Sequence, residues 1–237
     1  MSRLYGFCPS ALGANKFWVK HRRTVRMSVL LFELCALCGY CEAYNDCSKF
    51  IIVVGKASEM DKKDLTMPRY RFRCVLDITP EDLHKMGAKA VGLDIDNTLA
   101  PDGTFNFVEG VHEWIDKIQK AGFPITVISN GTFIRVIPIS KYLGNLPYVH
   151  LSCKPFSCGL KKAAKRMGVD ISELAMIGDQ LFSDIKAANR CGAIPVRVDP
   201  LPAKSLYPHY YKWKEKREEP ILREFEKNHG YGVEGND

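Results

Sequence analysis

Two aspartates stand two positions apart at the end of a short apolar run. Asp94 and Asp96 follow residues 91–93, and Asn97 and Thr98 continue the segment. An apolar run that stops at a polar loop is typical of a buried strand whose carboxyl end opens into a cleft. Two carboxylates this close repel each other, and the pKa of each is raised unless a cation lies between them. The segment therefore indicates a cation-assisted acid–base site rather than a plain turn.

More polar and charged residues follow later apolar runs in the chain: Ser129, Asn130, Lys154, Asp179 and Asp184. The carboxyl ends of parallel strands meet at one edge of a sheet, and ligands bind beyond that edge. We therefore expect these side chains to lie near Asp94.

The elements that must position them follow from the hydrophobic patterns. Strands are expected over residues 91–93, 124–128, 148–151, 173–177 and 193–198, and helices over 79–86, 108–120, 132–143, 158–167 and 180–190. Strands that alternate with helices imply right-handed parallel crossovers. The predicted fold class is α/β, an open, doubly wound parallel sheet.

The positive charge of the chain is concentrated at one end. The 237 residues are 46% hydrophobic and 26% charged, with a formal net charge of +7. Residues 1–32 hold six bases and no acid, so residues 33–237 carry 7 − 6 = +1. A nearly neutral main part does not indicate a nucleic-acid footprint, and no nucleic-acid partner is expected.

Four segments occur in a fixed order: Asp94-x-Asp96-x-Thr98, Ser129 after a strand, Lys154-Pro155, and Gly178-Asp179-x4-Asp184. Together they resemble the signature of the haloacid dehalogenase-like phosphatases. The sequence of residues 65–225 is similar to the YqeG-like branch of subfamily IIIA, which is related to phosphatidylglycerophosphate phosphatases. One example of the matching sequence is "IGDQLFSDIKAANRCGAIPVRVDPL".

The resemblance implies a Mg²⁺-dependent hydrolysis of phosphate monoesters through an aspartyl-phosphate intermediate. Asp94 would be the nucleophile, and Asp96 the general acid and base. Asp94, Asp179 and the main-chain carbonyl of Asp96 would hold the metal.

The resemblance also implies the groups that would bind the phosphoryl oxygens: Thr98, Ser129, Asn130 and Lys154. Asp184 would support the metal shell or Lys154.

Members of this superfamily often carry a cap domain between these segments. About 30 residues separate Thr98 from Ser129, and one helix and one strand use most of them, so no cap domain is expected. An uncapped cleft suits large or surface-bound substrates. The phosphorylated partner would then be a phospholipid head group, phosphatidylglycerophosphate in particular, with peripheral membrane contact as the associated hypothesis. The oligomeric state stays open.

Three regions are expected: an extension at residues 1–64 that is poorly ordered, the phosphatase domain at 65–203, and a basic, aromatic tail at 204–237. A short helix is expected from Pro220, either docked on the domain or lying on a membrane. Four cysteines have a spacing that partly resembles iron–sulfur and zinc sites: Cys35, Cys38, Cys41 and Cys47. No further ligand pair completes a closed site, so metal is not expected there.

The expected compartment is the cytoplasm, with a membrane-peripheral position. The chain has nine cysteines, an odd number that does not suit a framework of paired disulfides in a secreted protein. No signal peptide is recognisable. A mitochondrial or plastid presequence over residues 1–26 is the alternative. Two other functions stay open: a non-catalytic module that binds phosphate and Mg²⁺, and a nucleic-acid end phosphatase.

Overall fold

The computed structural model of the protein describes residues 64–201 and 208–233. These residues belong to one compact unit, Glu59–Asp237. Apart from Asp64, the expected N-terminal extension with its four clustered cysteines lies outside the described residues.

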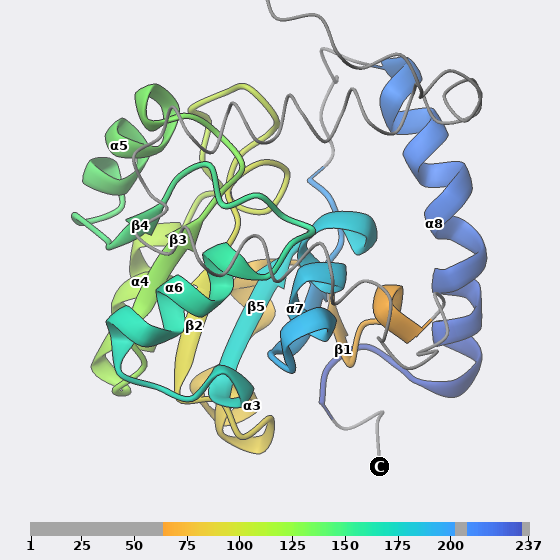
Figure 1. Ribbon diagram of the computed structural model, residues 1–237, viewed down its shortest axis with the longest axis horizontal. Helices are drawn as coiled ribbons and strands as arrows, with labels where there is room; N and C mark the ends of the chain where they lie inside the picture. Colours follow the sequence, from red (N-terminus) through yellow and green to blue (C-terminus); the bar gives the residue numbers. More distant parts are fainter. Residues whose placement is uncertain (1–63, 202–207, 234–237) are drawn as a thin grey trace, which may run out of the picture. The chain divides into compact units, whose positions relative to one another are not determined.

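A six-stranded parallel sheet in the order β1-β6-β5-β2-β3-β4 forms the centre of this unit (Figure 1). The strands are β1 (Tyr70–Phe72), β2 (Ala90–Leu93), β3 (Ile125–Ile128), β4 (Tyr148–Val149), β5 (Leu174–Gly178) and β6 (Ile194–Val198). The predicted α/β class with an open parallel sheet is confirmed. Sequence reasoning missed β1, because three residues with Arg71 in the middle form no apolar run.

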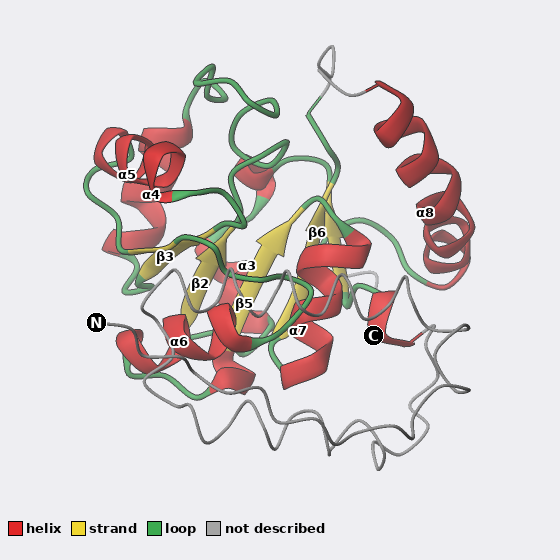
Figure 2. Ribbon diagram, turned by 45° about the horizontal axis from the view of Figure 1, so that its top comes forward, coloured by secondary structure: helices red, strands yellow, loops and turns green. Residues whose placement is uncertain are grey.

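Helices cover both faces of the sheet. They are α3 (Pro80–Lys85), α4 (Val111–Lys120), α5 (Phe133–Tyr142), α6 (Cys158–Met167) and α7 (Lys186–Cys191). A further helix, α8 (Pro208–Asn228), belongs to neither apolar cluster of the sheet. Helices α3, α4 and α5 share one apolar cluster with the sheet, and α6 and α7 share the other (Figure 2). Short 3-10 turns lie at Asp64–Thr66, Val75–Asp77 and Ile171–Glu173.

The local sequence explains the helices that carry this core. Thr79 caps α3 by accepting a hydrogen bond from the Asp82 amide, and Pro80 occupies the first helical position. In α4 the predicted apolar stripe is buried, and Trp114 Nε1 donates to the Ile78 carbonyl at 2.8 Å. The two helices therefore pack where their patterns predict.

The helix predicted over residues 180–190 starts differently from the prediction. A π-helical turn, η4 (Leu181–Ile185), precedes α7. The Gln180 carbonyl accepts hydrogen bonds from the amides of Ser183, Asp184 and Ile185, and the Gln180 amide donates to Asp184 Oδ2 at 3.0 Å. This wide turn sets the position of Asp184, and periodicity alone does not reveal it.

The tail helix is longer than expected. Instead of a short helix from Pro220, α8 begins at Pro208 and has 21 residues, with Pro220 inside it. The missing amide of Pro220 removes one helical hydrogen bond. Buried contacts of Lys214 and Glu218 with the domain hold the helix on the N-terminal side of that break. Among the described helices, none has the length and hydropathy needed to span a bilayer.

Candidate active site

The predicted residues lie at the carboxyl edge of the sheet. Asp94 directly follows β2, Ser129 follows β3 and Asp179 follows β5. Lys154 lies on the loop after β4, and Asp184 in η4. The parallel order places β2 between β5 and β3, so the three strand ends are neighbours.

Three buried aspartates converge there. Oxygens of Asp94, Asp179 and Asp184 lie within 4.8 Å of one another. The Lys154 ammonium donates to Asp94 Oδ1 at 2.6 Å and to the Ile128 carbonyl at 2.7 Å. It also lies 2.7 Å from Asp184 Oδ1, an ion pair without hydrogen-bond geometry. Lys154 therefore links two carboxylates of the cluster to the end of β3.

Burial dominates the electrostatics of this cluster. It raises the pKa of Asp94 to about 8, an effect that Lys154 opposes and Asp184 reinforces. Burial also raises the pKa of Asp179 to about 6, against the attraction of Lys214. Burial alone would lower the pKa of Lys154, but Asp184 and Asp94 together raise it. Crowded carboxylates of this kind are stabilised in their charged form by a cation.

Gly178, at the end of β5, makes room for Asp184. A Cβ atom on Gly178 would lie 2.4 Å from Asp184 Cγ and 2.5 Å from Asp184 Oδ2. Only glycine lets the η4 carboxylate approach this strand so closely.

The substitution Gly178→Ala is therefore expected to destabilise the protein by about 1–3 kcal/mol, because the new methyl group overpacks a buried site. Urea unfolding measures this loss. If the clash is with Asp184, the loss shrinks in an Asp184→Ala background, giving a coupling of more than about 0.5 kcal/mol in a double-mutant cycle. Additive losses would show that the glycine serves another purpose.

Asp96 lies apart from this cluster. Its Oδ1 forms a close ion pair with Arg135 Nη2 from α5, and the same nitrogen donates to the Thr104 carbonyl at 3.1 Å. The Asp96 side chain is 23% exposed, so it is the acid on the solvent side. The carboxylate that joins Asp94 and Asp179 is that of Asp184, which was expected only in a supporting role.

The residues predicted to bind phosphate occupy two kinds of position. Thr98 and Ser129 are buried; Thr98 Oγ1 has no hydrogen-bond partner, and Ser129 Oγ accepts from the Gly131 amide at 3.0 Å. The Asn130 side chain instead bonds both the amide and the carbonyl of Lys154, each at 2.8 Å. In this structure Asn130 thus holds the loop that carries Lys154.

Sequence reasoning missed the contribution of α8. The Lys214 ammonium is buried and donates to Asp179 Oδ2 at 2.6 Å. One turn later, Glu218 accepts from the Leu181 amide at 3.0 Å and pairs with Arg197 at 3.4 Å. Asp179 Oδ1 keeps no hydrogen-bond partner, so one oxygen of this buried carboxylate is satisfied and the other is not.

The same helix also contacts the loop after β2. The Asn97 side chain donates to the Tyr211 hydroxyl at 2.8 Å, and that hydroxyl donates to Asp102 Oδ2 at 2.9 Å. Helix α8 therefore ties together the two loops that carry Asp94 and Asp179. No periodicity in residues 208–228 could have indicated these contacts, because they depend on where the helix docks.

The cluster is less accessible than the expected open cleft. Asp94 and Lys154 are each 6% exposed, and Asp179 is fully buried. Between β2 and β4 the chain forms only α4, β3, α5 and connecting loops, so the expected absence of a cap domain agrees with the structure. The reduced access comes from the ammonium groups of Lys154 and Lys214, which lie directly against the carboxylates.

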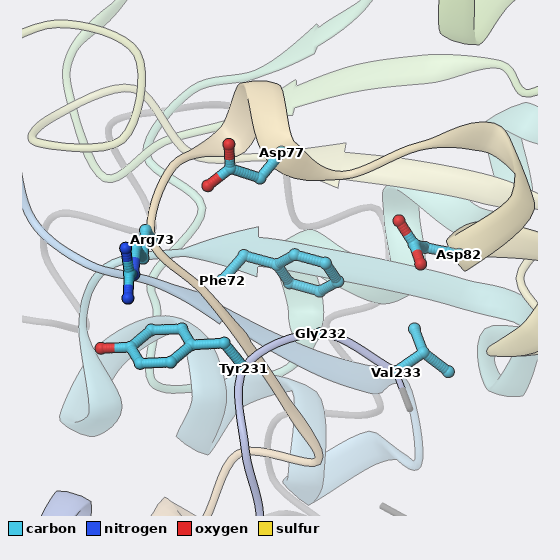
Figure 3. A pocket seen from close by; sticks show the side chains of 7 residues that line it. All are labelled: Phe72, Arg73, Asp77, Asp82, Tyr231, Gly232 and Val233. Atoms are coloured by element: carbon cyan, nitrogen blue, oxygen red, sulfur yellow. The ribbon is translucent and has the colours of Figure 1, made fainter. Parts of the chain in front are cut away.

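A cavity of about 360 Å³ lies elsewhere, between β1 and the end of the described chain (Figure 3). It is lined by Phe72, Arg73, Asp77, Asp82, Tyr231, Gly232 and Val233. Its two carboxylates serve local turns: Asp77 accepts from the Cys74 amide and Asp82 from the Thr79 amide. We therefore place the chemistry at the aspartate cluster.

Fold and site together define an open, parallel α/β domain with a cluster of buried aspartates at the carboxyl edge of its sheet. Residues 106–192 match the family model of the haloacid dehalogenase-like hydrolases. The chain is 30% identical to the probable phosphatase YqeG of Bacillus subtilis over 139 residues, which are 59% of this chain and 80% of that protein. The chain therefore belongs to the haloacid dehalogenase-like hydrolases, in the branch of the YqeG phosphatase, and is an enzyme of the phosphatase type.

Two further likenesses cover less of this chain. A phosphoglycolate phosphatase of Neisseria meningitidis is 32% identical over 89 residues, 34% of this chain and 37% of that protein. The cobalt-bound deoxy-D-mannose-octulosonate 8-phosphate phosphatase of Haemophilus influenzae gives a TM-score of 0.40 at 18% identity, over 55% of this chain and 77% of that one. The family assignment depends on the YqeG relative and not on these two.

Proposed function

We propose that the protein hydrolyses phosphate monoesters with Mg²⁺ through an aspartyl-phosphate on Asp94. The observation that supports this most is the convergence of Asp94, Asp179 and Asp184, with Lys154 bonded to the first of them. A structural role for three buried carboxylates is disfavoured, because their mutual repulsion costs stability.

The donor set fits a divalent cation of the magnesium type. The metal-ligating atoms that converge are all carboxylate oxygens, and these are the ligands that hard cations prefer. The buried, unpartnered Oδ1 of Asp179 is a natural ligand atom. Asp94, Asp179 and the Asp96 carbonyl would hold the ion, with Asp184 beside them. When bound, Mg²⁺ would supply positive charge that stabilises the phosphoryl oxygens.

The reaction would proceed in two steps. A carboxylate oxygen of Asp94 attacks phosphorus and forms an O–P bond, while the bond to the leaving oxygen breaks and Asp96 gives that oxygen a proton. Water then attacks the same phosphorus and loses a proton to Asp96, and the O–P bond to Asp94 breaks. Inorganic phosphate and the free carboxylate result.

The remaining residues would bind and orient. Lys154 fixes one oxygen of Asp94 and would place a positive charge beside the phosphoryl group, together with the hydroxyls of Thr98 and Ser129. Asn130 would act through Lys154 as a positioning residue, because its amide holds the lysine main chain. Arg135 would hold Asp96 at the entrance.

Lys214 has a separate role in this proposal: it would compete with the divalent cation for Asp179. Its ammonium bonds one oxygen of that carboxylate at 2.6 Å, and two like charges near one carboxylate repel. Lys214 would thus neutralise the buried Asp179 whenever the cation is absent.

The substrate would be a large or surface-held ester, and phosphatidylglycerophosphate is the foremost candidate. The lack of a cap domain supports a large ester, and the sequence resemblance to a branch related to phosphatidylglycerophosphate phosphatases supports this particular lipid. A cytoplasmic, membrane-peripheral location belongs to the same proposal.

A substrate panel tests it, with phosphatidylglycerophosphate in mixed micelles, soluble esters and a 5′-phosphorylated oligonucleotide, each with Mg²⁺ or with chelator. We expect Mg²⁺-dependent release of phosphate, fastest from the lipid. Phosphate and Mg²⁺ binding without turnover of any ester would point instead to a regulatory module. Preference for the oligonucleotide would point to nucleic-acid end processing.

A further inference from the structure

Large apolar side chains are exposed mainly around the aspartate cluster. Among the described residues, five such side chains lie on loops at the carboxyl edge of the sheet, on the first turn of α5 or on α8: Phe105, Phe133, Ile134, Phe156 and Trp213. We call these five residues the apolar rim. Two other exposed aromatics pack elsewhere: Tyr142 stacks on Phe107, and Tyr231 lies under Arg71.

Each segment of the rim is close in sequence to a residue of the site. Phe133 and Ile134 begin α5 a few residues after Ser129, and Phe156 follows Lys154 by two positions. Trp213 precedes Lys214 on α8. These four residues therefore lie on segments that carry residues of the site, and Phe105 is linked to it through Arg135, the ion-pair partner of Asp96.

Arginines accompany the rim. Arg135 lies over the ring of Phe105 at 5.6 Å from its centroid, and Arg190 over Phe156 at 5.4 Å. Arg217 lies 4.6 Å from the rings of both Phe182 and Trp213. A guanidinium stacked on a ring can still offer its remaining N–H groups to phosphate oxygens, as Arg190 would beyond its bond to the Pro155 carbonyl at 2.8 Å.

Exposed aromatic and aliphatic side chains interleaved with arginines match one kind of surface well. At a lipid bilayer, aromatic rings favour the interface between head groups and acyl chains, and cations are attracted to anionic lipids. A protein partner would require a matching apolar patch and complementary carboxylates, and it would cover the site that a substrate must reach. The charge and the position of the rim therefore favour the bilayer.

We infer that the apolar rim and its arginines dock the domain on an anionic phospholipid bilayer with the aspartate cluster facing the head groups. This inference rests on the proposed function, since it explains how an uncapped site would meet a phosphate ester held at a surface. Docking would bring the phosphate to Asp94 without extracting the lipid.

Vesicle co-sedimentation of the full chain tests this inference. Vesicles of phosphatidylcholine mixed with phosphatidylglycerol are expected to bind the protein more tightly than vesicles of phosphatidylcholine alone. The double substitution Phe133→Ser with Ile134→Ser should weaken binding to the anionic vesicles about tenfold or more, because two apolar side chains no longer insert. Arg190→Gln with Arg217→Gln should lower the preference for anionic lipid, and the six bases of residues 1–32 would supply what is left.

The matched control is Tyr142→Ser. Tyr142 ends the same helix and is 54% exposed as Phe133 is, but its ring packs against Phe107 and His112 and is not free to insert. This variant should bind vesicles as tightly as the wild type does. All variants keep the basic residues 1–32, so differences in binding between them do not come from that segment. Equal binding to anionic vesicles by the double variant and the wild type would overturn the inference. So would equal binding of the wild type to both kinds of vesicle, or release of the wild type from anionic vesicles by a competing oligonucleotide.

Hydrolysis of p-nitrophenyl phosphate separates this inference from the proposed function. The rim variants should retain wild-type turnover of this soluble ester. If the wild type turns over no ester, the proposed function fails. If turnover is normal and rim variants still bind vesicles, only the docking inference fails.

Discussion

The substitution Asp94→Asn is expected to reduce Mg²⁺-dependent hydrolysis of a soluble phosphate ester by about 10³-fold or more. An amide oxygen is a poor nucleophile toward phosphorus, so the covalent step is lost. The fold should survive, because an asparagine has the same shape and can still accept the hydrogen bond from Lys154. Steady-state kinetics and circular dichroism measure the two effects.

Asp116→Asn is the matched control. Asp116 is an exposed carboxylate of α4 that lies 3.9 Å from Lys120, so its loss should leave both activity and stability unchanged. Asp94→Asn with wild-type turnover would show that the nucleophile is another group. If Asp94→Asn does not fold, Asp94→Glu replaces it in the kinetic experiment. This variant keeps the negative charge but moves the carboxylate oxygen, so it should also lose activity.

Lys214→Met is expected to give the largest change in stability. In the presence of chelator, this variant should lose about 3 kcal/mol of unfolding free energy, because buried Asp179 is left without its cation. Added Mg²⁺ should recover more stability in the variant than in the wild type, since the ammonium no longer competes for the carboxylate. Urea unfolding with chelator and with Mg²⁺ measures both quantities.

Lys216→Met provides the comparison for this experiment. Lys216 lies on the same helix but is exposed, so its loss should change the unfolding free energy by less than about 0.5 kcal/mol. An equal response to Mg²⁺ in Lys214→Met and the wild type would contradict competition for Asp179. Weaker Mg²⁺ binding in the variant would instead assign Lys214 the task of orienting that carboxylate.

The strand ends were predictable from sequence, and the contacts of α8 were not. Asp94, Ser129 and Asp179 each follow an apolar run, and a parallel sheet brings the ends of such runs to one edge. Their placement therefore needs only the order of the strands. Lys214 is separated from Asp179 by 35 residues, and its burial depends on how α8 docks on the finished domain.

Two local features show the same limit on a smaller scale. A helical pattern was visible around Asp184, but the π turn η4 depends on the Gln180 carbonyl accepting three amides. The ion pair of Arg135 with Asp96 joins α5 to the loop after β2, and nothing in the spacing of these two residues indicates it. Periodicity reports burial, whereas charge pairing across elements depends on the tertiary fold.

Trapping the covalent intermediate tests the central claim most directly. The enzyme would be mixed with Mg²⁺ and a phosphate ester labelled in its phosphoryl group, quenched in acid within one turnover, and digested for mass spectrometry. We predict one phosphoryl group on the peptide that contains Asp94, and none in Asp94→Asn. Label on another residue, or full turnover with no label on the protein, would contradict the account.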